Sequence, residues 1–342
     1  MGNDNDKSKK KKTGDEFNKE DNIQSTIKIA NIIGKKKKSE LTNQDVPHVI
    51  EGLGENVKYF AVYDGHGAKG KEAAEALKRE INKKLNSDKK KISKFRDCFR
   101  VEQYFKDLFK NIQKKMSSSN DYELSGSCAI CVLIIDNKMY SINVGDSRCV
   151  LGQKKGGDGK KEAEKIGIEM SIDHKPTRDD EQKRIIEKGG EVSEKIPGAP
   201  RVFRKNDDVP GLAVARSLGD IVAHEVGVSC EPEVFEKELD SDDHFIVIGS
   251  DGIWDAMSSC EVVGFIFQKM ETNKEDVARL LAEECRNRWE ILNLFKQKYI
   301  LEINSSKDNN DGVKEKGGQH NVADIDDITC VISFINIEKD DY

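Results

Sequence analysis

The sequence has no long apolar run, so nothing in it predicts a membrane-spanning helix. None of its 342 residues belongs to a stretch near the roughly 20 apolar residues that cross a bilayer. A secretory signal is also missing, because no apolar core follows the Lys-rich start of the chain. Hydrophobic residues make up 36% and charged residues 35%, which is typical of a polar protein that folds around a core. We therefore expect a soluble protein.

Disulfide spacing is absent as well. The eight cysteines are scattered, and only Cys128 and Cys131 form a C-x-x-C. They lie in an apolar run that predicts a strand, on which residues three apart point to opposite faces. This disfavours a shared metal or a redox pair. We expect buried free thiols and a cytoplasmic protein, because free thiols persist in a reducing compartment.

An excess of positive charge is lacking too. The net charge of −6 gives no reason to expect nucleic acid as the main partner. The Gly/Lys/Glu-rich residues 154–165 do not form a nucleotide-binding P-loop, because Lys161 stands where Ser or Thr is required. We expect these residues to form a surface loop.

Residues 1–22 form a charged tail with little to bury, so we expect disorder there. Gly2 becomes a possible myristoylation site once Met1 is removed, and five lysines follow within residues 7–12. An acyl chain and a basic cluster together would hold the tail against the inner face of a membrane. Asp6 stands where the lipidation pattern prefers Ser or Thr. A solubilising tail without lipid is the alternative.

Residues 23–342 show the patterns of an α+β domain. Strands are predicted near residues 25–34, 58–64, 125–136, 139–144, 149–151, 244–249 and 328–337. Helices are predicted over residues 68–85, 92–116, 178–188, 260–270 and 274–294. The helix over 92–116 has an apolar stripe that includes Phe95, Phe99 and Phe105. Residues 304–321 are of low complexity, and we expect a mobile insert.

The run Tyr63-Asp64-Gly65-His66-Gly67 ends a predicted strand and opens a helix. Its glycines permit a tight turn, in which a carboxylate and a main-chain carbonyl can face the same ion. Mg²⁺ and Mn²⁺ prefer such oxygen ligands. For this run alone, an ordinary strand-end turn with a solvated Asp is an equal alternative.

Three further aspartates, Asp146, Asp251 and Asp326, also end apolar strands. Carboxylates at strand ends can converge, where mutual repulsion raises their pKa values unless divalent cations bind. Two such metals can activate a water and clamp a phosphoryl group. His66 lies two residues from Asp64 and can protonate a leaving oxygen, although a purely structural histidine is the alternative.

The chain resembles the metal-dependent Ser/Thr protein phosphatases of the 2C type. The resemblance spans roughly residues 40–337, and its motifs occur in the family's order. They are Tyr63-Asp64-Gly65-His66-Gly67, Ser125-Gly126-Ser127, Asn143-Val144-Gly145-Asp146-Ser147-Arg148, Asp173-His174-Lys175-Pro176, residues 212–220, Glu231-Pro232-Glu233, residues 250–255 and Asp326-Asp327-Ile328-Thr329.

The resemblance implies a four-layer α-β-β-α sandwich of two antiparallel sheets flanked by antiparallel helices, with a flap at about residues 190–211. It implies hydrolysis of phosphoserine and phosphothreonine in a phosphoprotein substrate. A hydroxide that bridges two Mg²⁺ or Mn²⁺ ions would attack, with no phosphoenzyme. A third metal would bind more loosely. We expect a monomer.

The resemblance also implies residue roles. His66 would be the general acid for the leaving oxygen. The metal ligands would be Asp64, Asp251 and Asp326 at one ion, Asp64 and the Gly65 carbonyl at the second, and Asp146 and Asp255 with Asp251 nearby at the third.

The chain departs from the family near residue 44. Thr42-Asn43-Gln44-Asp45 stands where the family carries Arg-x-x-x-Glu-Asp, so Gln44 and Asp45 are the expected counterparts at the second metal. Glu40 replaces the Arg that grips phosphate, and Lys37 or Lys38 is the expected substitute, without the bidentate fork of Arg. Asp327 replaces the usual Asn.

Two other functions are weighed against an active phosphatase. A phosphatase-like binding module would keep the fold without turnover, but the aspartates expected to bind metal are all present. A two-metal nuclease is disfavoured by the acidic net charge and by the lack of a basic aromatic groove.

Overall fold

The computed structural model describes residues 23–35, 42–156, 163–195, 200–307 and 325–337. Their strands form two large antiparallel sheets and one small one. The first sheet has the order β12-β5-β4-β3-β2, with β11 paired to β4. Its strands are β2 (Val46–Gly54), β3 (Val57–His66), β4 (Gly126–Ile135), β5 (Lys138–Val144), β11 (Leu218–Gly219) and β12 (Glu233–Glu238).

The second sheet has the order β1-β14-β13-β6-β7. Its strands are β1 (Ile23–Ile32), β6 (Arg148–Lys155), β7 (Glu164–Glu169), β13 (Asp243–Gly249) and β14 (Ile328–Ile337). The first and last strands of the described chain, β1 and β14, are therefore hydrogen-bonded neighbours. This pairing brings Asp326, just before β14, into the same domain as the turn after β3.

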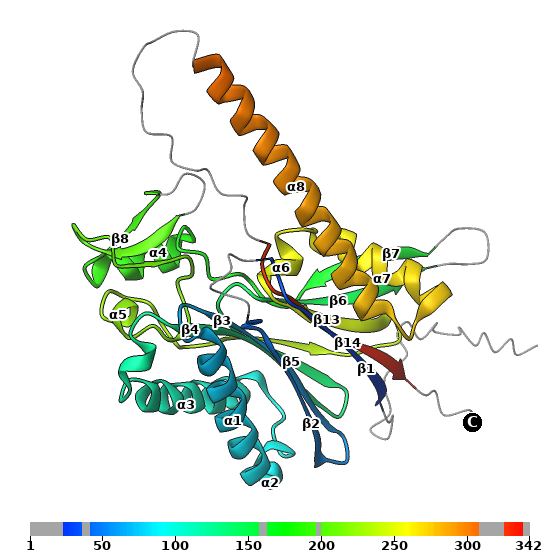
Figure 1. Cartoon of the computed structure of the whole chain (residues 1–342). Helices are drawn as coiled ribbons and strands as arrows, with labels where there is room; N and C mark the ends of the chain where they lie inside the picture. The colour runs from blue at the N-terminus through cyan, green and yellow to red at the C-terminus, as the bar shows by residue number, and fades with distance from the viewer. Residues whose placement is uncertain (1–22, 36–41, 157–162, 196–199, 308–324, 338–342) are drawn as a thin grey trace, which may run out of the picture.

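Helices cover the outer face of each sheet (Figure 1). On the first sheet lie α1 (Gly70–Ser87) and α3 (Cys98–Met116), and on the second lie α7 (Ser259–Asn273) and α8 (Val277–Lys307). The short helices are α2 (Lys89–Ile92), the 3-10 turn η1 (Asn120–Tyr122), α4 (Asp179–Glu187), α5 (Ile221–His224) and α6 (Asp251–Trp254). Among the described residues, no helix combines the length and apolar character that crossing a membrane requires.

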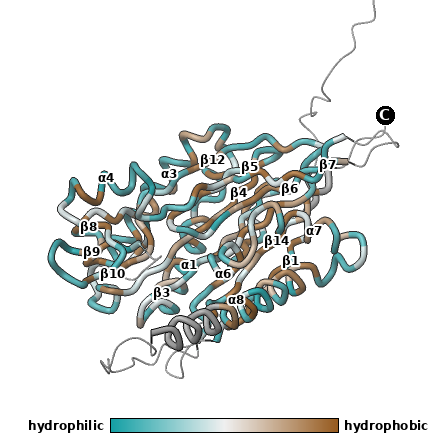
Figure 2. Tube along the Cα trace, turned by 90° about the horizontal axis from the view of Figure 1, so that it is seen from above, coloured by the Kyte–Doolittle hydropathy of each residue, from teal (hydrophilic) through white to brown (hydrophobic). Residues whose placement is uncertain are grey.

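Strand β3 shows why the sheets stack. Successive side chains of a strand point to opposite faces. Tyr59 and Tyr63 pack toward α1 and α3, whereas Phe60 and Val62 pack between the two sheets. A third apolar layer fills the space between the second sheet and helices α7 and α8. Figure 2 shows hydrophobic segments along buried strands such as β4. The predicted four-layer α+β sandwich is confirmed.

Several predicted boundaries were wrong. The helix expected over residues 92–116 is divided into α2 and α3, because Asp97 caps a new helix by accepting a hydrogen bond from the Arg100 amide. Phe99 therefore lies in the first turn of α3 with 73% of its surface exposed, outside the apolar stripe. Strands β6 and β7 occupy both ends of the loop expected over residues 154–165.

Two further segments differ from the sequence prediction. Helix α8 continues to Lys307, into the segment expected to be mobile from residue 304. The loop-rich segment over residues 190–211 contains the small sheet of β8 (Gly190–Ser193), β9 (Arg201–Arg204) and β10 (Pro210–Leu212). This small sheet has its own apolar cluster around Ile185 and Val202.

Candidate metal and catalytic site

The last three residues of β3 are Asp64, Gly65 and His66, and a short turn leads from them into α1. Gly65 must be glycine, because a Cβ atom there would lie 2.2 Å from the Gly70 carbonyl oxygen and 2.9 Å from that of Gln44. The close approach of these segments holds the end of β3 against the start of α1. Asp64 is thereby held at the end of β3, an inner strand of the first sheet.

Two aspartates from other strand ends join Asp64. Asp146 follows β5 of the first sheet, and Asp251 begins α6 directly after β13 of the second sheet. Oxygen atoms from the three carboxylates all lie within 4.8 Å of one another. The structure therefore brings together three predicted metal ligands that are up to 187 positions apart in the sequence (251 − 64).

These carboxylates repel one another strongly. Burial, followed by the charges of Asp45, Asp251, Asp326 and Asp146, raises the pKa of Asp64 well above its ordinary value. Burial and the charge of Asp326 likewise raise the pKa of Asp251. Asp326 thus lies within electrostatic reach of both, and metal ligation by Asp326 stays a prediction. Buried carboxylates this close together are relieved of their repulsion either by protonation or by a bound cation.

Asp255, at the C-cap of α6, belongs to the same environment. Burial raises its pKa, whereas the ammonium of Lys175 lowers it. Lys175 itself forms an ion pair with the Asp146 carboxylate, and this pairing raises the pKa of Lys175 despite burial. A built-in ammonium group therefore stands among the carboxylates expected at the loosest metal position.

Asp45 and Gln44, which are predicted at the second metal, both form hydrogen bonds within the protein. Asp45 is buried and accepts a 2.7 Å hydrogen bond from the Ser250 hydroxyl, and burial raises its pKa to about 7. The side-chain amide of Gln44 donates a 2.7 Å hydrogen bond to the Gly67 carbonyl. Gln44 therefore supports the turn after His66, and metal ligation by Gln44 and Asp45 stays a prediction.

Asp327 connects two segments of the chain through hydrogen bonds to main-chain amides. Its carboxylate accepts hydrogen bonds of 2.8 Å from the amides of Gly34 and Gln44. It therefore ties the segment after β1 to the segment before β2. The predicted phosphate-binding Lys37 and Lys38, together with Glu40, lie outside the described residues, and so does the predicted lipidation site Gly2.

His66 has a specific acidic partner. Its Nε2 atom lies 2.6 Å from Oδ2 of Asp220, which is buried. Burial alone would lower the pKa of His66, but the charge and hydrogen bond of Asp220 outweigh burial and raise it. The ring is held in place and retains its proton more readily than a free histidine.

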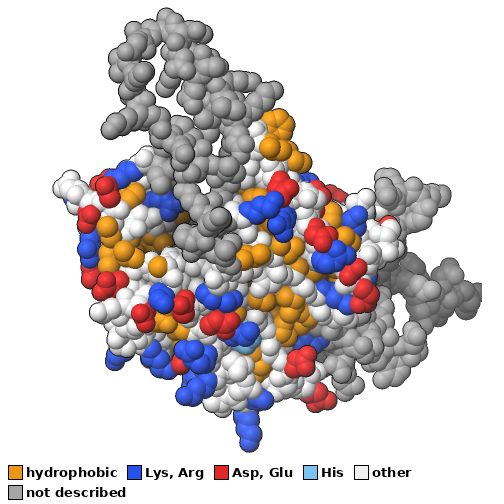
Figure 3. All heavy atoms as spheres, viewed as in Figure 1, with side chains coloured by type: hydrophobic (Ala, Val, Ile, Leu, Met, Phe, Trp, Pro, Cys, Tyr) orange, Lys and Arg blue, Asp and Glu red, His pale blue; other side chains and the backbone are white. Residues whose placement is uncertain are grey.

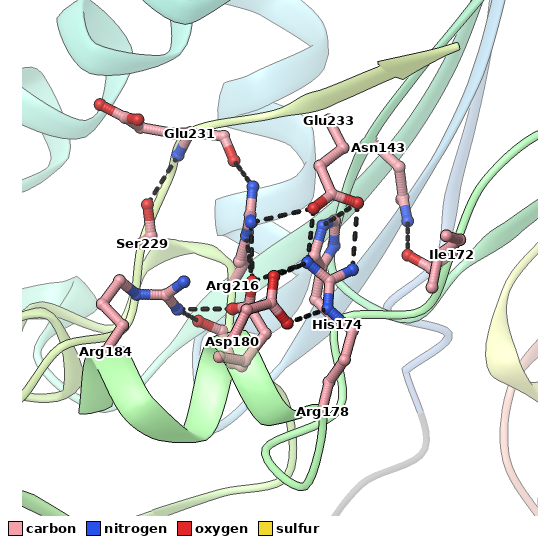
Figure 4. A network of polar contacts seen from close by, with 12 residues as sticks. Asn143, Ile172, His174, Arg178, Asp180, Arg184, Arg216, Ser229, Glu231 and Glu233 are labelled. Atoms are coloured by element: carbon pink, nitrogen blue, oxygen red, sulfur yellow. Dashed lines mark hydrogen bonds and ion pairs between the residues drawn. The ribbon is translucent and has the colours of Figure 1, made fainter. Parts of the chain in front are cut away.

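A second group of possible ligands lies in the described part of the chain. Atoms of His174, Glu181 and Glu233 approach within 4.8 Å of one another. Figure 4 shows that Arg178 and Arg216 point at the Glu233 carboxylate, and both also bind Glu181. Three guanidinium groups, with Arg184 the third, already neutralise these acids. This cluster is a structural ion-pair network rather than a metal site.

The network supports the first site. His174 contacts Gly145, the residue before Asp146, through Nδ1 and through its main-chain amide. Lys175, the next residue, pairs with Asp146. The arginine network therefore fixes the segment that orients Asp146.

The donor set fits divalent metal ions. Every candidate ligand side chain except Gln44 is a carboxylate, and the cluster combines burial with close approach of like charges. Hard cations such as Mg²⁺ and Mn²⁺ select oxygen ligands of this kind. Bound ions would remove the repulsion that raises the pKa values of Asp64 and Asp251.

Two residues of the site were missed from the sequence. In the sequence, Asp220 stands at the end of the motif over residues 212–220 without an indicated role. Its pairing with His66 depends on a left-handed backbone (φ +43°) that carries no sequence signal beyond the preceding Gly219. Lys175 was noted only within the motif Asp173-His174-Lys175-Pro176. The structure shows their roles through two contacts, of Asp220 with His66 and of Lys175 with Asp146.

Comparison with known proteins agrees with this geometry. The family model described as protein phosphatase 2C matches residues 26–291. A probable protein phosphatase 2C 73 of Arabidopsis thaliana is 29% identical over 301 residues, which cover 78% of this chain and 76% of the relative. A probable protein phosphatase 2C 64 of Oryza sativa is 32% identical over 253 residues, covering 72% of this chain but only 58% of the relative.

Solved structures agree on the fold. The serine-threonine phosphatase 2C of Toxoplasma gondii superposes with a TM-score of 0.69 at 18% identity, covering 91% of this chain and 94% of the other. A sex-determining protein of C. elegans gives a TM-score of 0.62 at 20% identity, with 90% and 64% covered. The chain belongs to the protein phosphatase 2C family, whose members are metal-dependent protein Ser/Thr phosphatases.

Proposed function

We propose that this protein hydrolyses phosphoserine and phosphothreonine in protein substrates with the help of Mg²⁺ or Mn²⁺. The observation that carries the proposal is the convergence of Asp64, Asp146 and Asp251 within 4.8 Å, with His66 only two residues from Asp64. When bound, the ions would neutralise the carboxylates, polarise the phosphoryl group and lower the pKa of a water molecule. The inactive binding module is not favoured, because the predicted aspartate ligands are intact.

The side chains of the protein have distinct tasks in this reaction. Asp64, Asp251 and Asp326, with Asp146 and Asp255, would hold the ions. His66 would donate a proton to the departing serine or threonine oxygen, which is a poor leaving group without one. Asp220 would hold the His66 ring and favour its protonated form. Lys175 would keep Asp146 neutralised whenever no ion is bound next to it.

A hydrolysis assay tests the proposed function. Metal-depleted protein should release phosphate from a phosphoserine peptide only after Mn²⁺ is added, and Asp64→Ala should lose at least 100-fold in kcat, the scale expected for removal of electrostatic transition-state stabilisation. Lys154→Glu is the matched control, because Lys154 is exposed on β6. Wild-type hydrolysis at background level, or equal hydrolysis by Asp64→Ala, would contradict the proposal.

The phosphate-gripping cation is proposed to be Lys37 or Lys38. The support is the sequence position, since Glu40 stands where the family's Arg would be and a carboxylate cannot attract phosphate. Replacing both lysines by Ala should raise KM for a phosphopeptide and leave Mn²⁺ affinity unchanged. An unchanged KM would reject this assignment.

The N-terminal tail is proposed to attach the otherwise cytoplasmic, monomeric enzyme to the inner face of a membrane through a myristoyl group on Gly2. The support is the sequence of Gly2 followed by five lysines in residues 7–12. Intact mass of protein from its native cell should show the added acyl chain, and membrane fractionation should show loss of binding in Gly2→Ala. An unmodified N-terminus would reject the proposal.

A further inference from the structure

A strongly basic surface surrounds the junction of α2 and α3. Residues 89–100 contain six cationic side chains and one acidic side chain, in a chain whose net charge is −6. The cations are Lys89, Lys90, Lys91, Lys94, Arg96 and Arg100, and we call this surface the α2–α3 patch. In Figure 3, Lys and Arg side chains protrude at the lower margin, where α2 lies in Figure 1.

Much of this charge is not neutralised by the protein itself. Arg96 approaches Asp136 at 3.6 Å and Arg100 approaches Asp97 at 3.4 Å. Among the described residues, no carboxylate forms an ion pair with any of the four lysines. Lys91 instead lies over the ring of Tyr104, 5.0 Å from its centroid. The patch therefore has positive potential available for an acidic partner.

The patch is also hollowed and apolar at its centre. A cavity of about 360 Å³ is lined by three cations, three aromatic side chains, one amide and one acid: Lys91, Lys94, Arg100, Phe95, Phe99, Tyr104, Gln103 and Asp107. Phe95 is buried, whereas 73% of Phe99 is exposed. Phe99 therefore offers apolar contact area beside a hollow that Lys91, Lys94 and Arg100 also line.

The patch lies away from the catalytic turn. Helix α1 begins just after His66 and ends just before α2. Its 18 residues span about 27 Å at 1.5 Å per residue. A partner bound at the α2–α3 patch would therefore leave the aspartate cluster accessible.

We infer that the α2–α3 patch docks an acidic segment of a partner protein, with one aromatic or large aliphatic side chain inserted beside Phe99 and carboxylates facing the lysines. The hollow favours a side chain from a peptide over the flat surface of a bilayer, and the net positive charge favours an acidic sequence. That the docked partner is a phosphoprotein substrate rests on the proposed phosphatase activity. The docking itself does not.

Peptide binding to the full chain tests the inference. The probe is a fluorescein-labelled peptide of sequence EDDFEDE, measured by fluorescence anisotropy in 50 mM NaCl. Reversing two charges with Lys91→Glu and Lys94→Glu should weaken binding about tenfold or more, and Phe99→Ala should weaken it about fivefold, as expected for two lost charge pairs and one apolar contact. Higher salt should also weaken binding.

Matched controls separate this surface from general charge effects. The double variant Lys154→Glu with Lys155→Glu changes the net charge by the same amount as the patch variant, but at exposed residues of β6 outside the patch. Its affinity for the peptide should stay within about twofold of the wild-type affinity. The peptide EDDAEDE should bind more weakly than EDDFEDE to wild type but equally to Phe99→Ala. Equal weakening by both double variants, or no discrimination between the peptides, would overturn the inference.

Two further measurements identify the occupant. Vesicles of phosphatidylcholine with 30% phosphatidylserine should not bind better to wild type than to the patch variants, and preferential vesicle binding without peptide binding would overturn the inference in favour of a membrane surface. A phosphoserine peptide extended by EDDFEDE should show a KM that rises in the patch variants, with kcat for p-nitrophenyl phosphate unchanged. If the wild-type protein does not hydrolyse p-nitrophenyl phosphate at all, that result would instead count against the proposed function.

Discussion

The Nε2 atom of His66 lies 2.6 Å from the carboxylate of Asp220, although 154 positions separate the two residues. Asp220 adopts a left-handed backbone conformation (φ +43°) and is almost fully buried. This pair connects the end of β3 to the end of the segment over residues 212–220. It determines how readily the histidine keeps its proton.

Asp220→Asn should shift the basic limb of the pH profile. The carboxylate raises the pKa of His66, so its removal lowers that pKa, and kcat on a phosphoserine peptide should fall at a pH about one unit lower than in wild type. Asn tolerates a left-handed backbone better than most residues, so the fold should be retained. The rate on p-nitrophenyl phosphate is the control, because its leaving group needs no proton. Equal shifts on both substrates would contradict the role of His66 as an acid.

Asp251→Asn should weaken metal binding more than Asp146→Asn. Asp251 is expected at the tighter position, and Asp146 is already paired with Lys175. Calorimetric titration with Mn²⁺ should show a loss of at least about tenfold for Asp251→Asn, the scale of removing a charged ligand. The reverse order of the two variants would contradict the ligand assignment.

The metal-free protein should lose stability as pH rises. The folded-state pKa of Asp45 is raised to about 7 from an ordinary value of 3.8. The contribution of Asp45 to the free energy of unfolding is therefore fully present below about pH 3.8 and is lost as the pH rises through about 7. Urea unfolding in EDTA between pH 5 and 8 should show this decline, and Asp45→Asn should make it less steep, because the raised pKa values of Asp64 and Asp251 still contribute to it. A decline of the same slope in Asp45→Asn would contradict this assignment.

Lys175→Met should increase the affinity for Mn²⁺ at the Asp146 position. The lysine ammonium competes with an ion for the Asp146 carboxylate, so its removal should raise the affinity about three- to tenfold. The melting temperature in EDTA should fall, because buried Asp146 would lose its partner. Lys183→Met, at an exposed position on α4, is the control. Weaker Mn²⁺ binding by Lys175→Met would show that the lysine supports the ion instead.

Glu181→Gln should destabilise the fold without changing the number of metal ions that the protein binds. Glu181 is fully buried and accepts hydrogen bonds from Arg178, Arg184 and Arg216. Removing its charge should cost about 3–5 kcal/mol in the free energy of unfolding, measured with urea. Glu187→Gln, whose side chain is exposed, should change it by less than about 0.5 kcal/mol. A changed Mn²⁺ stoichiometry in Glu181→Gln would show that the cluster binds metal after all.

The sequence predicted those site residues that lie at the ends of apolar strands. Asp64 and Asp251 each follow an apolar run beside glycine, and convergence at a sheet edge follows from strand geometry. Asp326 lies at a strand end too, two residues before the start of the last strand. The layered fold was predictable because alternating residues such as Phe60 and Val62 mark the face between the sheets.

Contacts between distant loops were not predictable in this way. The pair of His66 and Asp220 depends on how the end of β3 meets the distant link between β11 and α5, and no periodic pattern in the sequence reports that contact. Phe99 was assigned to a buried stripe because apolar spacing alone does not reveal the capping by Asp97, which starts α3 one residue before Phe99. The exposure of Phe99, on which the proposed docking surface depends, was visible only in the structure.

Anomalous diffraction from a Mn²⁺-soaked crystal tests the central claim most directly. We predict manganese peaks among the carboxylates of Asp64, Asp146, Asp251 and Asp326, with Asp64 touching the strongest peak. Manganese bound between His174, Glu181 and Glu233, with none among these aspartates, would contradict it.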